Sequence, residues 1–336
     1  MSAMQAWEIE RGAGIESLRR IERALPVPGG GEVRVRLRAV ALNARDLNVA
    51  AVGSGRVVPA SDAAGVVEAI GEGVTRWRVG DRVAPAFYPR WIDGLPTTEA
   101  TVGSLGGAVD GVLAEQVLAH EDALFALPPH LDDVEGATLP CAALTAWHAL
   151  FVAQAPKPGE TVLLLGTGGV SMWALTLAKA AGLRAIVTSS DDAKLERARH
   201  LGADATINYR TQPDWDREAL RLTDGRGVDS VLDIGGERTL GPAIAAVRAG
   251  GTVAMIGGAS GAFGGRIEPF ALIGGAKRLA GVLVGSRTMA EDLVRFVAQR
   301  GLRPVVDRVF AFDEAPAAFR HLATGRHFGK VVVAMG

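Results

Sequence analysis

The chain has 336 residues, of which 48% are hydrophobic and 22% charged, and its 36 Lys and Arg nearly balance its 37 Asp and Glu. This length favours about two domains, and a net charge of −1 argues against a basic face, so nucleic acid is not an expected partner. A single cysteine excludes an intrachain disulfide and is typical of a cytoplasmic protein. The first twelve residues contain no apolar stretch of the kind that forms a signal peptide.

Residues 1–131 have the pattern of a mainly β domain with short connections. Val33–Val40 alternates apolar and basic residues, which is the period of a half-exposed strand. Gly65–Gly80 predicts two short strands around a Gly-Glu-Gly turn.

Strands and helices alternate over residues 132–287, and this alternation predicts an α/β domain with a doubly wound parallel sheet. The expected strands are Thr161–Gly166, Arg184–Ser190, Ala205–Tyr209, Val228–Ile234, Thr252–Ile256 and Leu279–Gly285. The uncharged run 161–178 is long enough to span a membrane, but its glycines indicate strand, turn and helix, so no membrane is expected. Residues 288–336 return to strand-like runs around one helix, and we expect them to rejoin the first domain.

The segment Leu163–Ser171 (LLLGTGGVS) joins an apolar strand to a helix in the manner of a dinucleotide-binding turn. Gly166 suits a tight turn, and Gly168 allows a pyrophosphate to approach the backbone at the positive end of the helix. Ser171 stands where the third glycine of G-x-G-x-x-G is expected, and a turn that binds nothing is the alternative. The predicted phosphate contacts are Gly166, Gly168, Gly169 and Val170.

The end of the second strand bears on the choice of cofactor. NAD sites place an acidic residue there for the ribose 2′-hydroxyl, whereas this strand ends in Ser189 and Ser190, with Lys194 one helical turn further on. Two hydroxyls and a cation match a 2′-phosphate, so we predict NADPH. Asp191 and Asp192 complicate this prediction, but they are also typical caps of a helix N-terminus.

Several motifs in order resemble the medium-chain dehydrogenase/reductase superfamily, and in particular its zinc-free, quinone-oxidoreductase-like branch. They are PASDAAGVVEAIGEGVTRWRVGDRV, LPCAALTAWHAL, GETVLLLGTGGVSMWALTLAKA and HFGKVVV. The resemblance implies a GroES-like catalytic β domain completed by the C-terminal tail, and a Rossmann domain between them.

The resemblance also bears on zinc. Zinc-dependent relatives carry Cys where this chain has Asn43, and Gly-His-Glu where it has Ala60-Ser61-Asp62. Neither an asparagine nor a serine is a competent zinc ligand, and Cys141, at the position of a third ligand, cannot hold the metal alone. A four-cysteine structural site is impossible with one cysteine, and the six histidines show no ligand spacing. We therefore predict that the protein binds no zinc.

Without a metal, the charge that develops on a substrate oxygen needs hydrogen-bond donors or a general acid. Asn43 occupies the vacated ligand position, where its amide could reach the substrate oxygen or the nicotinamide ribose. Asp46 orients that amide or caps a turn. Tyr88 is the remaining phenol, because the resemblance places Tyr209 against the adenosine phosphate; packing beneath a loop is the alternative for Tyr88. Many relatives have an aromatic residue where this chain has Ala44.

The remaining predicted cofactor contacts come from three places. The resemblance places Thr145 near the nicotinamide, with an ordinary helix residue as the alternative, and strand carboxyl ends supply Gly257, Gly258 and Val284. The Phe328-Gly329-Lys330 segment is expected to close over the cofactor with Lys330 facing a phosphate; a strand with a solvated lysine is the alternative.

These features predict an NADPH-dependent oxidoreductase that transfers hydride to a small enone, quinone or carbonyl. An NADPH-binding protein with little or no turnover, crystallin-like or regulatory, is the alternative, and a methyltransferase is disfavoured by the Ser-Ser-Lys set. The resemblance also implies a homodimer joined edge to edge at Leu279–Gly285, an apolar strand that would otherwise be exposed.

Overall fold

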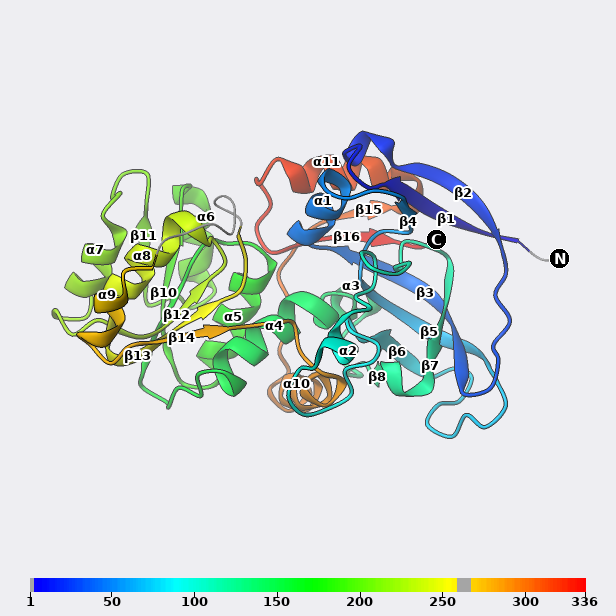
Figure 1. The fold of residues 1–336 in the computed structure, drawn as a ribbon, viewed down its shortest axis with the longest axis horizontal. Coiled ribbons are helices and arrows are strands. Elements are labelled where there is room, and N and C mark those ends of the chain that lie inside the picture. The colour runs from blue at the N-terminus through cyan, green and yellow to red at the C-terminus, as the bar shows by residue number, and fades with distance from the viewer. Residues whose placement is uncertain (1–2, 259–266) are drawn as a thin grey trace. The chain divides into compact units, whose positions relative to one another are not determined.

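The computed structural model describes residues 3–258 and 267–336, and the chain falls into two compact units (Figure 1). The first unit comprises Met1–Leu144 and Val284–Gly336, and the second comprises Thr145–Leu283. The expected boundaries were 131/132 and 287/288, so residues 132–144 and 284–287 lie with the first unit instead of the second.

The second unit is built on a six-stranded sheet in which every described pair of neighbours is parallel. Its strand order, β11-β10-β9-β12-β13-β14, starts from β9 and runs outward in both directions, as the alternating pattern predicted. The strands are β9 Thr161–Leu164, β10 Arg184–Ser189, β11 Ala205–Asn208, β12 Val228–Asp233, β13 Val247–Met255 and β14 Arg278–Gly281. The helices are α5 Gly169–Ala180, α6 Asp192–His200, α7 Trp215–Arg221, α8 Glu237–Ala246 and α9 Pro269–Ile273, with a π-helical turn at His148–Val152.

Two of these strands differ from the expected ranges. β13 begins five residues before Thr252, and β14 ends at Gly281 instead of continuing to Gly285. β14 is short because the chain passes into the first unit at Val284.

The first unit contains an antiparallel three-stranded sheet, β2-β1-β4, and a larger sheet ordered β15-β16-β3-β5-β6-β8, with β7 also pairing β3. Its strands are β1 Ala3–Glu10, β2 Arg19–Ala24, β3 Glu32–Leu42, β4 Arg56–Val57, β5 Asp62–Ile70, β6 Arg82–Pro85, β7 Gln116–His120, β8 Leu124–Ala126, β15 Val306–Ala311 and β16 Lys330–Ala334. Its helices are α1 Ala44–Ala51, α2 Thr98–Thr101, α3 Asp133–Gly136, α10 Arg287–Arg300 and α11 Ala315–Ala323, with 3-10 turns at Ile15–Ser17, Glu121–Ala123 and Phe312–Glu314 and a π-helical turn at Leu139–Ala143. The short helix α4 Leu144–Trp147 spans the boundary.

The C-terminal tail rejoins the first unit, as predicted. β16 pairs antiparallel with β3, placing Val331 opposite Leu42, and β15 adds to β16 in parallel. The alternation seen in Val33–Val40 arises because the valines and Leu37 are buried in β3 while the arginines are more exposed.

The prediction of two strands within Gly65–Gly80 is wrong in its second half. β5 ends at Ile70, and the next strand, β6, starts only after the segment is complete. The backbone N–H groups of Thr75 and Arg76 donate to the carboxylate of Glu121 instead of a neighbouring strand. The Glu121 carboxylate thus takes the hydrogen bonds that a neighbouring strand would accept in a sheet.

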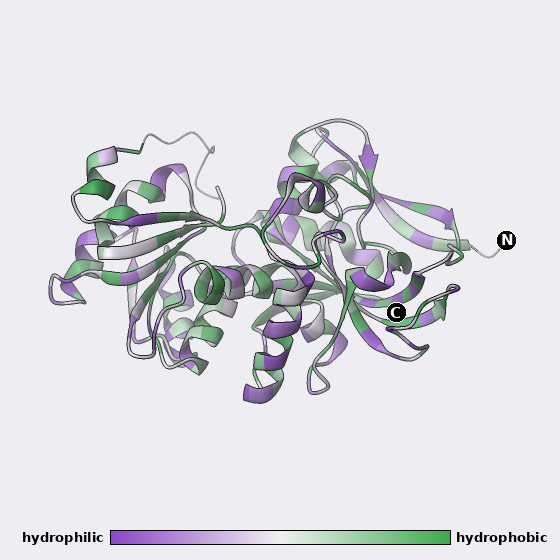
Figure 2. Ribbon diagram, turned by 60° about the horizontal axis from the view of Figure 1, so that its bottom comes forward, coloured by the Kyte–Doolittle hydropathy of each residue, from purple (hydrophilic) through white to green (hydrophobic). Residues whose placement is uncertain are grey.

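Hydropathy follows the elements closely. Hydrophobic residues concentrate along the strands, and several helices alternate hydrophobic and hydrophilic residues along their length (Figure 2). Among residues 3–258 and 267–336, no helix combines the length and apolar character needed to cross a membrane.

Candidate active site

The glycine turn of the second unit has the geometry expected for a phosphate site. Gly166, after β9, has a φ of 76°, a conformation that residues with a side chain rarely adopt. Gly168 caps α5 without a side-chain hydrogen bond, and the first turn of α5 contains no acidic residue. The first N–H groups of this helix, those of Gly169 and Val170 among them, have no intrahelical acceptor and suit an anion.

Ser171 explains how the turn works without a third glycine. Its side chain is buried, and its hydroxyl donates to the Leu165 carbonyl at 2.7 Å. The hydroxyl therefore ties α5 to the end of β9, where a glycine would only allow close packing.

The end of β10 brings together three of the predicted adenosine-ribose contacts. The backbone N–H of Tyr209 donates to the Ser189 carbonyl, so the two residues are neighbours at the strand ends. Ser189 is buried, and its hydroxyl accepts from the backbone N–H of Asp191 at 3.3 Å. Ser190 and Tyr209 retain exposed surface.

Both aspartates that follow have structural partners. Asp191 caps α6 by accepting from the N–H groups of Ala193 and Lys194, and Asp192 accepts from the Asn208 side-chain amide at 2.7 Å. Sequence reasoning anticipated the cap but not the Asn208 contact.

A second pair of glycines adjoins the predicted Gly257 and Gly258. A side chain at Gly236, whose φ is 87°, would meet the Gly258 backbone at 2.9 Å. Asp233 holds this turn, since its Oδ1 accepts from the backbone N–H groups of Gly235 and Gly236. Sequence reasoning missed this turn, although an acidic residue and two glycines directly after a buried strand could have indicated it.

The other two residues predicted for the nicotinamide side, Thr145 and Val284, belong to different units. Thr145 is buried in α4, in the second unit, whereas Val284 lies beyond β14 in the first unit. Their proposed contacts remain predictions.

In the first unit, the side chain of Asn43 lies at the start of α1, directly after β3. Its Oδ1 accepts a hydrogen bond from Lys330 Nζ at 2.6 Å, and the same Nζ donates to the Leu42 carbonyl at 2.8 Å. Lys330 is only 2% exposed.

This placement bears on the roles predicted for the C-terminal segment. The Lys330 ammonium is enclosed and bonded within the first unit. Phe328 is 1% exposed, and its backbone N–H donates to Asp307. The predicted contacts of both residues with a cofactor remain predictions. The strand β16 directs Lys330 toward Asn43, a contact that the sequence pattern did not reveal.

The residues at the expected zinc position do not suit a zinc ion. Asp62 accepts from the Ser61 hydroxyl at 2.7 Å and from the Cys141 backbone N–H at 3.2 Å, and it lies 3.5 Å from Lys330 Nζ. Burial, and next the charge of Asp62, raise the pKa of the Cys141 thiol far above its usual range, which disfavours the thiolate that zinc requires. A lysine cation at the carboxylate further opposes a second cation. Within the described part of the chain, no cluster of three or more His, Cys, Asp and Glu could hold a metal ion.

Asp46 fixes the backbone of Asn43. Its Oδ2 accepts from the Asn43 N–H at 2.8 Å, and its own N–H donates to the Asn43 carbonyl. Asp46 is fully buried, and burial raises its pKa to about 6, although the nearby Arg45 lowers it. Asp46 thus fixes Asn43 at the start of α1, where the two residues form a capping box.

Tyr88 lies in the same unit, half-buried in an aromatic group. Its ring meets Phe87 edge-on at 4.6 Å between centroids and Trp91 at 6.1 Å. Burial raises the pKa of Tyr88, and the charge of Arg45 opposes this effect. Tyr88 thus packs against neighbouring aromatic rings, and both its role as a proton donor and the purely structural alternative remain predictions.

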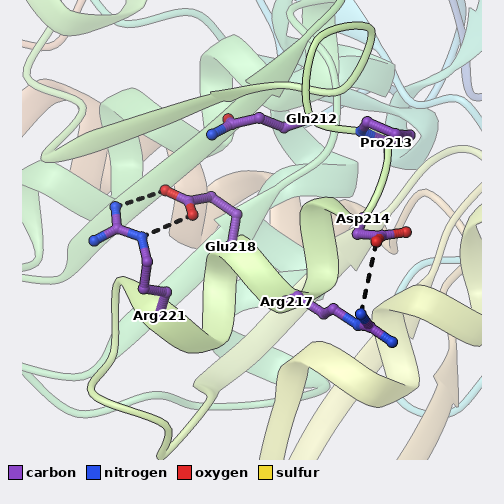
Figure 3. A pocket seen from close by; sticks show the side chains of 6 residues that line it. All are labelled: Gln212, Pro213, Asp214, Arg217, Glu218 and Arg221. Carbon is purple, nitrogen blue, oxygen red and sulfur yellow. Dashed lines mark hydrogen bonds and ion pairs between the residues drawn. The ribbon is translucent and has the colours of Figure 1, made fainter.

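A cavity of about 380 Å³ on the second unit lies apart from both the predicted cofactor contacts and the residues around Asn43 (Figure 3). Its charged side chains pair with one another, Arg221 with Glu218 and Arg217 with Asp214. None of the residues predicted for the site lines it; the lining residues are Gln212, Pro213, Asp214, Arg217, Glu218 and Arg221.

Comparison with known proteins identifies both units. Residues 29–129 match the alcohol dehydrogenase GroES-like domain, and residues 169–299 match the zinc-binding dehydrogenase family. A zinc-type alcohol dehydrogenase-like protein of Schizosaccharomyces pombe is 40% identical, over 96% of both chains, and a quinone oxidoreductase of Pseudomonas aeruginosa is 33% identical, over 91% of this chain and 92% of its own.

Solved structures agree with these relatives. A putative alcohol dehydrogenase from Sinorhizobium meliloti covers 99% of both chains with a TM-score of 0.92 and 43% identity. A structure described as an NAD-dependent alcohol dehydrogenase covers 99% of this chain and all of its own, with a TM-score of 0.90 and 35% identity. The chain therefore belongs to the medium-chain dehydrogenase/reductase superfamily and is an NAD(P)H-dependent oxidoreductase.

Proposed function

We propose that this protein is a zinc-independent, NADPH-dependent reductase that delivers hydride to a conjugated enone, a quinone or a reactive carbonyl. The observation that carries the proposal is the group of side chains around Asn43. The Asn43 amide stands in place of a cysteine ligand, burial raises the pKa of the Cys141 thiol, and the Lys330 cation lies beside both Asn43 and Asp62.

The proposed preference for NADPH rests on the end of β10. Ser190, Lys194 and Tyr209 supply two hydroxyls and a cation near the adenosine ribose, and Ser189 shapes the turn between them. Asp191 is engaged as a helix cap, so the positive end of the helix partly offsets the repulsion that its carboxylate exerts on a phosphate.

The chemistry follows from what the first unit can donate. A bound nicotinamide dinucleotide would supply the hydride, and the substrate oxygen then gains negative charge. The Asn43 amide would donate to that oxygen, and Tyr88 or water would provide the proton. Conjugation spreads the charge over an enolate or a quinol ring, so such substrates demand less of neutral donors than a simple ketone does.

The relatives are consistent with more than one substrate class. One is named a quinone oxidoreductase, and another is named a zinc-type alcohol dehydrogenase-like protein. The donor group around Asn43 favours the quinone and enone class for this chain.

We also propose that the protein is a cytoplasmic homodimer. β14 ends the parallel sheet, and Phe270, Ile273 and Leu283, which flank it in sequence, are exposed and apolar. Pairing of two β14 edges would cover such a surface. The cytoplasmic location rests on the single, buried Cys141.

The direct test is NADPH oxidation, followed by absorbance, with a panel of quinones, enones, ketones and aldehydes. Turnover with quinones or enones, unaffected by a chelator, is the expected result. Tight NADPH binding without turnover on the whole panel would instead favour the non-catalytic alternative, to which the small Ala44 also points.

A further inference from the structure

We propose that Lys330 is a positioning residue, which holds the Asn43 amide so that its NH₂ group faces the reacting oxygen. This inference rests on the proposed function and assigns a role to a buried cation that the chemistry above does not use directly.

The bond between the two side chains determines which way the amide points. A lysine ammonium donates hydrogen bonds and cannot accept them. The atom of Asn43 that lies 2.6 Å from Lys330 Nζ must therefore be the carbonyl oxygen. The NH₂ group is then on the other side of the amide carbon and points away from Lys330.

The NH₂ group has no other use in the fold. Asn43 Nδ2 is enclosed by protein atoms and has no hydrogen-bond partner among the described residues. A buried donor left without an acceptor is unfavourable, and it becomes favourable when an acceptor arrives. A substrate oxygen that gains negative charge is such an acceptor.

The surroundings leave the amide as the only part of Asn43 still to be oriented. Its backbone N–H and carbonyl are both bonded to Asp46, which fixes the main chain at the start of α1. The remaining freedom is a rotation that exchanges Oδ1 and Nδ2, and only one of these orientations satisfies Lys330.

Lys330 is itself held firmly. The register of β16 against β3 sets Val331 opposite Leu42, so the preceding residue is carried to the end of β3. Its Nζ also donates to the Leu42 carbonyl and lies 3.5 Å from Asp62 Oδ2. A cation with three partners cannot readily turn away from the amide.

A double-mutant cycle tests the proposal. Lys330→Met should lower kcat at least about tenfold and change the KM for NADPH much less, because the hydride donor is bound by the other unit's glycine turn. In an Asn43→Ala background the same change should cost less than about threefold, since Lys330 acts through Asn43. Equal losses in both backgrounds would overturn the proposal.

Three further variants separate positioning from folding. Lys179→Met is the matched control, because Lys179 Nζ likewise donates to a carbonyl, that of Leu183, and to a carboxylate, that of Asp204; it should leave kcat unchanged. Lys330→Arg keeps the donors and should restore part of the activity. Asn43→Asp keeps an acceptor for Lys330, so it should fold with an undiminished Tm and still lose kcat.

A measurement without turnover distinguishes failure of this inference from failure of the proposed function. In nitrogen-15 spectra, the side-chain NH₂ signals of Asn43, assigned by their loss in Asn43→Ala, should shift in Lys330→Arg and Lys330→Met. Their hydrogens should also exchange faster with water once Lys330 is lost. Unchanged signals in both variants would show that Lys330 does not hold the amide, whether or not the wild type reduces any substrate in the panel.

Discussion

The carboxylate of Asp191 accepts a hydrogen bond from the backbone N–H of Lys194 at 3.2 Å, so an acidic and a basic residue lie together at the N-terminus of α6. In this turn the acid is engaged with the helix N-terminus, which stabilises its charge. The side chain of Lys194 can then meet a ribose 2′-phosphate while Asp191 still opposes that phosphate. We expect the balance between these two charges to set the cofactor preference.

We expect NADPH to bind at least about tenfold more tightly than NADH, a difference of about 1.4 kcal/mol. Lys194→Ala should reduce this ratio, because it removes the cation and leaves Asp191 in place. Calorimetric titration with both dinucleotides measures the ratio of the two dissociation constants. Lys157→Ala, which removes an exposed lysine elsewhere in the second unit, is the control. Equal affinities in the wild type would contradict the assignment.

The sequence was sufficient to predict the second unit because its signals are local. A buried strand, the glycine turn and the following helix occupy one continuous segment, and α5 begins at Gly169 as the turn requires. The prediction of a second strand within Gly65–Gly80 was wrong because its determinant is not local. The backbone N–H groups of Thr75 and Arg76 donate to Glu121, which is distant in sequence and cannot be recognised from the local pattern.

Purified protein should contain no stoichiometric zinc, and chelators should leave its activity unchanged. The reason is the donor set, in which Cys141 stays protonated and Asp62 already faces a lysine cation. Elemental analysis after dialysis, with a zinc-dependent alcohol dehydrogenase as the positive control, is the measurement. One tightly held zinc per chain would refute the interpretation.

If Asn43 is the main donor to the substrate oxygen, Asn43→Ala should lower kcat by about 10²-fold or more, the scale for losing one oxyanion donor. NADPH affinity should barely change. Asn48→Ala, an exposed position on the same helix, is the control. If Tyr88 is the proton source, Tyr88→Phe should carry the larger loss. Full activity in both variants would assign the proton to solvent and remove both residues from the chemistry.

The buried Asp46 should make stability depend on pH. Its pKa rises from 3.8 to about 6 on folding, so the folded chain binds the proton more tightly than the unfolded chain. The stabilisation is complete below pH 3.8 and is lost as the pH rises through 6, an effect on the order of 3 kcal/mol. Asp46→Asn should abolish this contribution, because an amide oxygen still accepts from the Asn43 N–H.

Urea unfolding at several pH values measures that effect. The stability of Asp46→Asn relative to wild type should increase between pH 4 and pH 7. Arg45, Asp62 and Lys330 also act on this carboxyl, and they remain in both proteins. A difference that does not vary with pH would mean that folding does not raise the pKa of Asp46.

Sedimentation at micromolar concentration should give twice the 34.9 kDa chain mass. Leu283→Lys should shift the protein toward monomer, because it places a charge beside the β14 edge. Val79→Lys, a similar change at an exposed valine of the first unit, should not. A monomeric wild type would reject the proposed dimer.

The role of Lys330 shows where sequence reasoning reaches its limit. The HFGKVVV motif singled out Lys330 but did not show which residues its side chain contacts, because that depends on the register between β16 and β3. Register across a separation of 288 residues is set by tertiary packing, so the contact with Leu42 became visible only in the fold. Asn43, by contrast, could be named from its position alone.

The pairing of β16 with β3 also has a consequence for biosynthesis. The second unit, residues 145–283, is continuous, whereas the first needs strands from both sides of it. A ribosome will have released the whole nucleotide-binding sheet before it makes Lys330, and until then β3 has an open edge on the side that β16 will cover. Such an edge invites pairing with other chains. The newly made protein should therefore depend on chaperones most between the synthesis of β3 and that of β16.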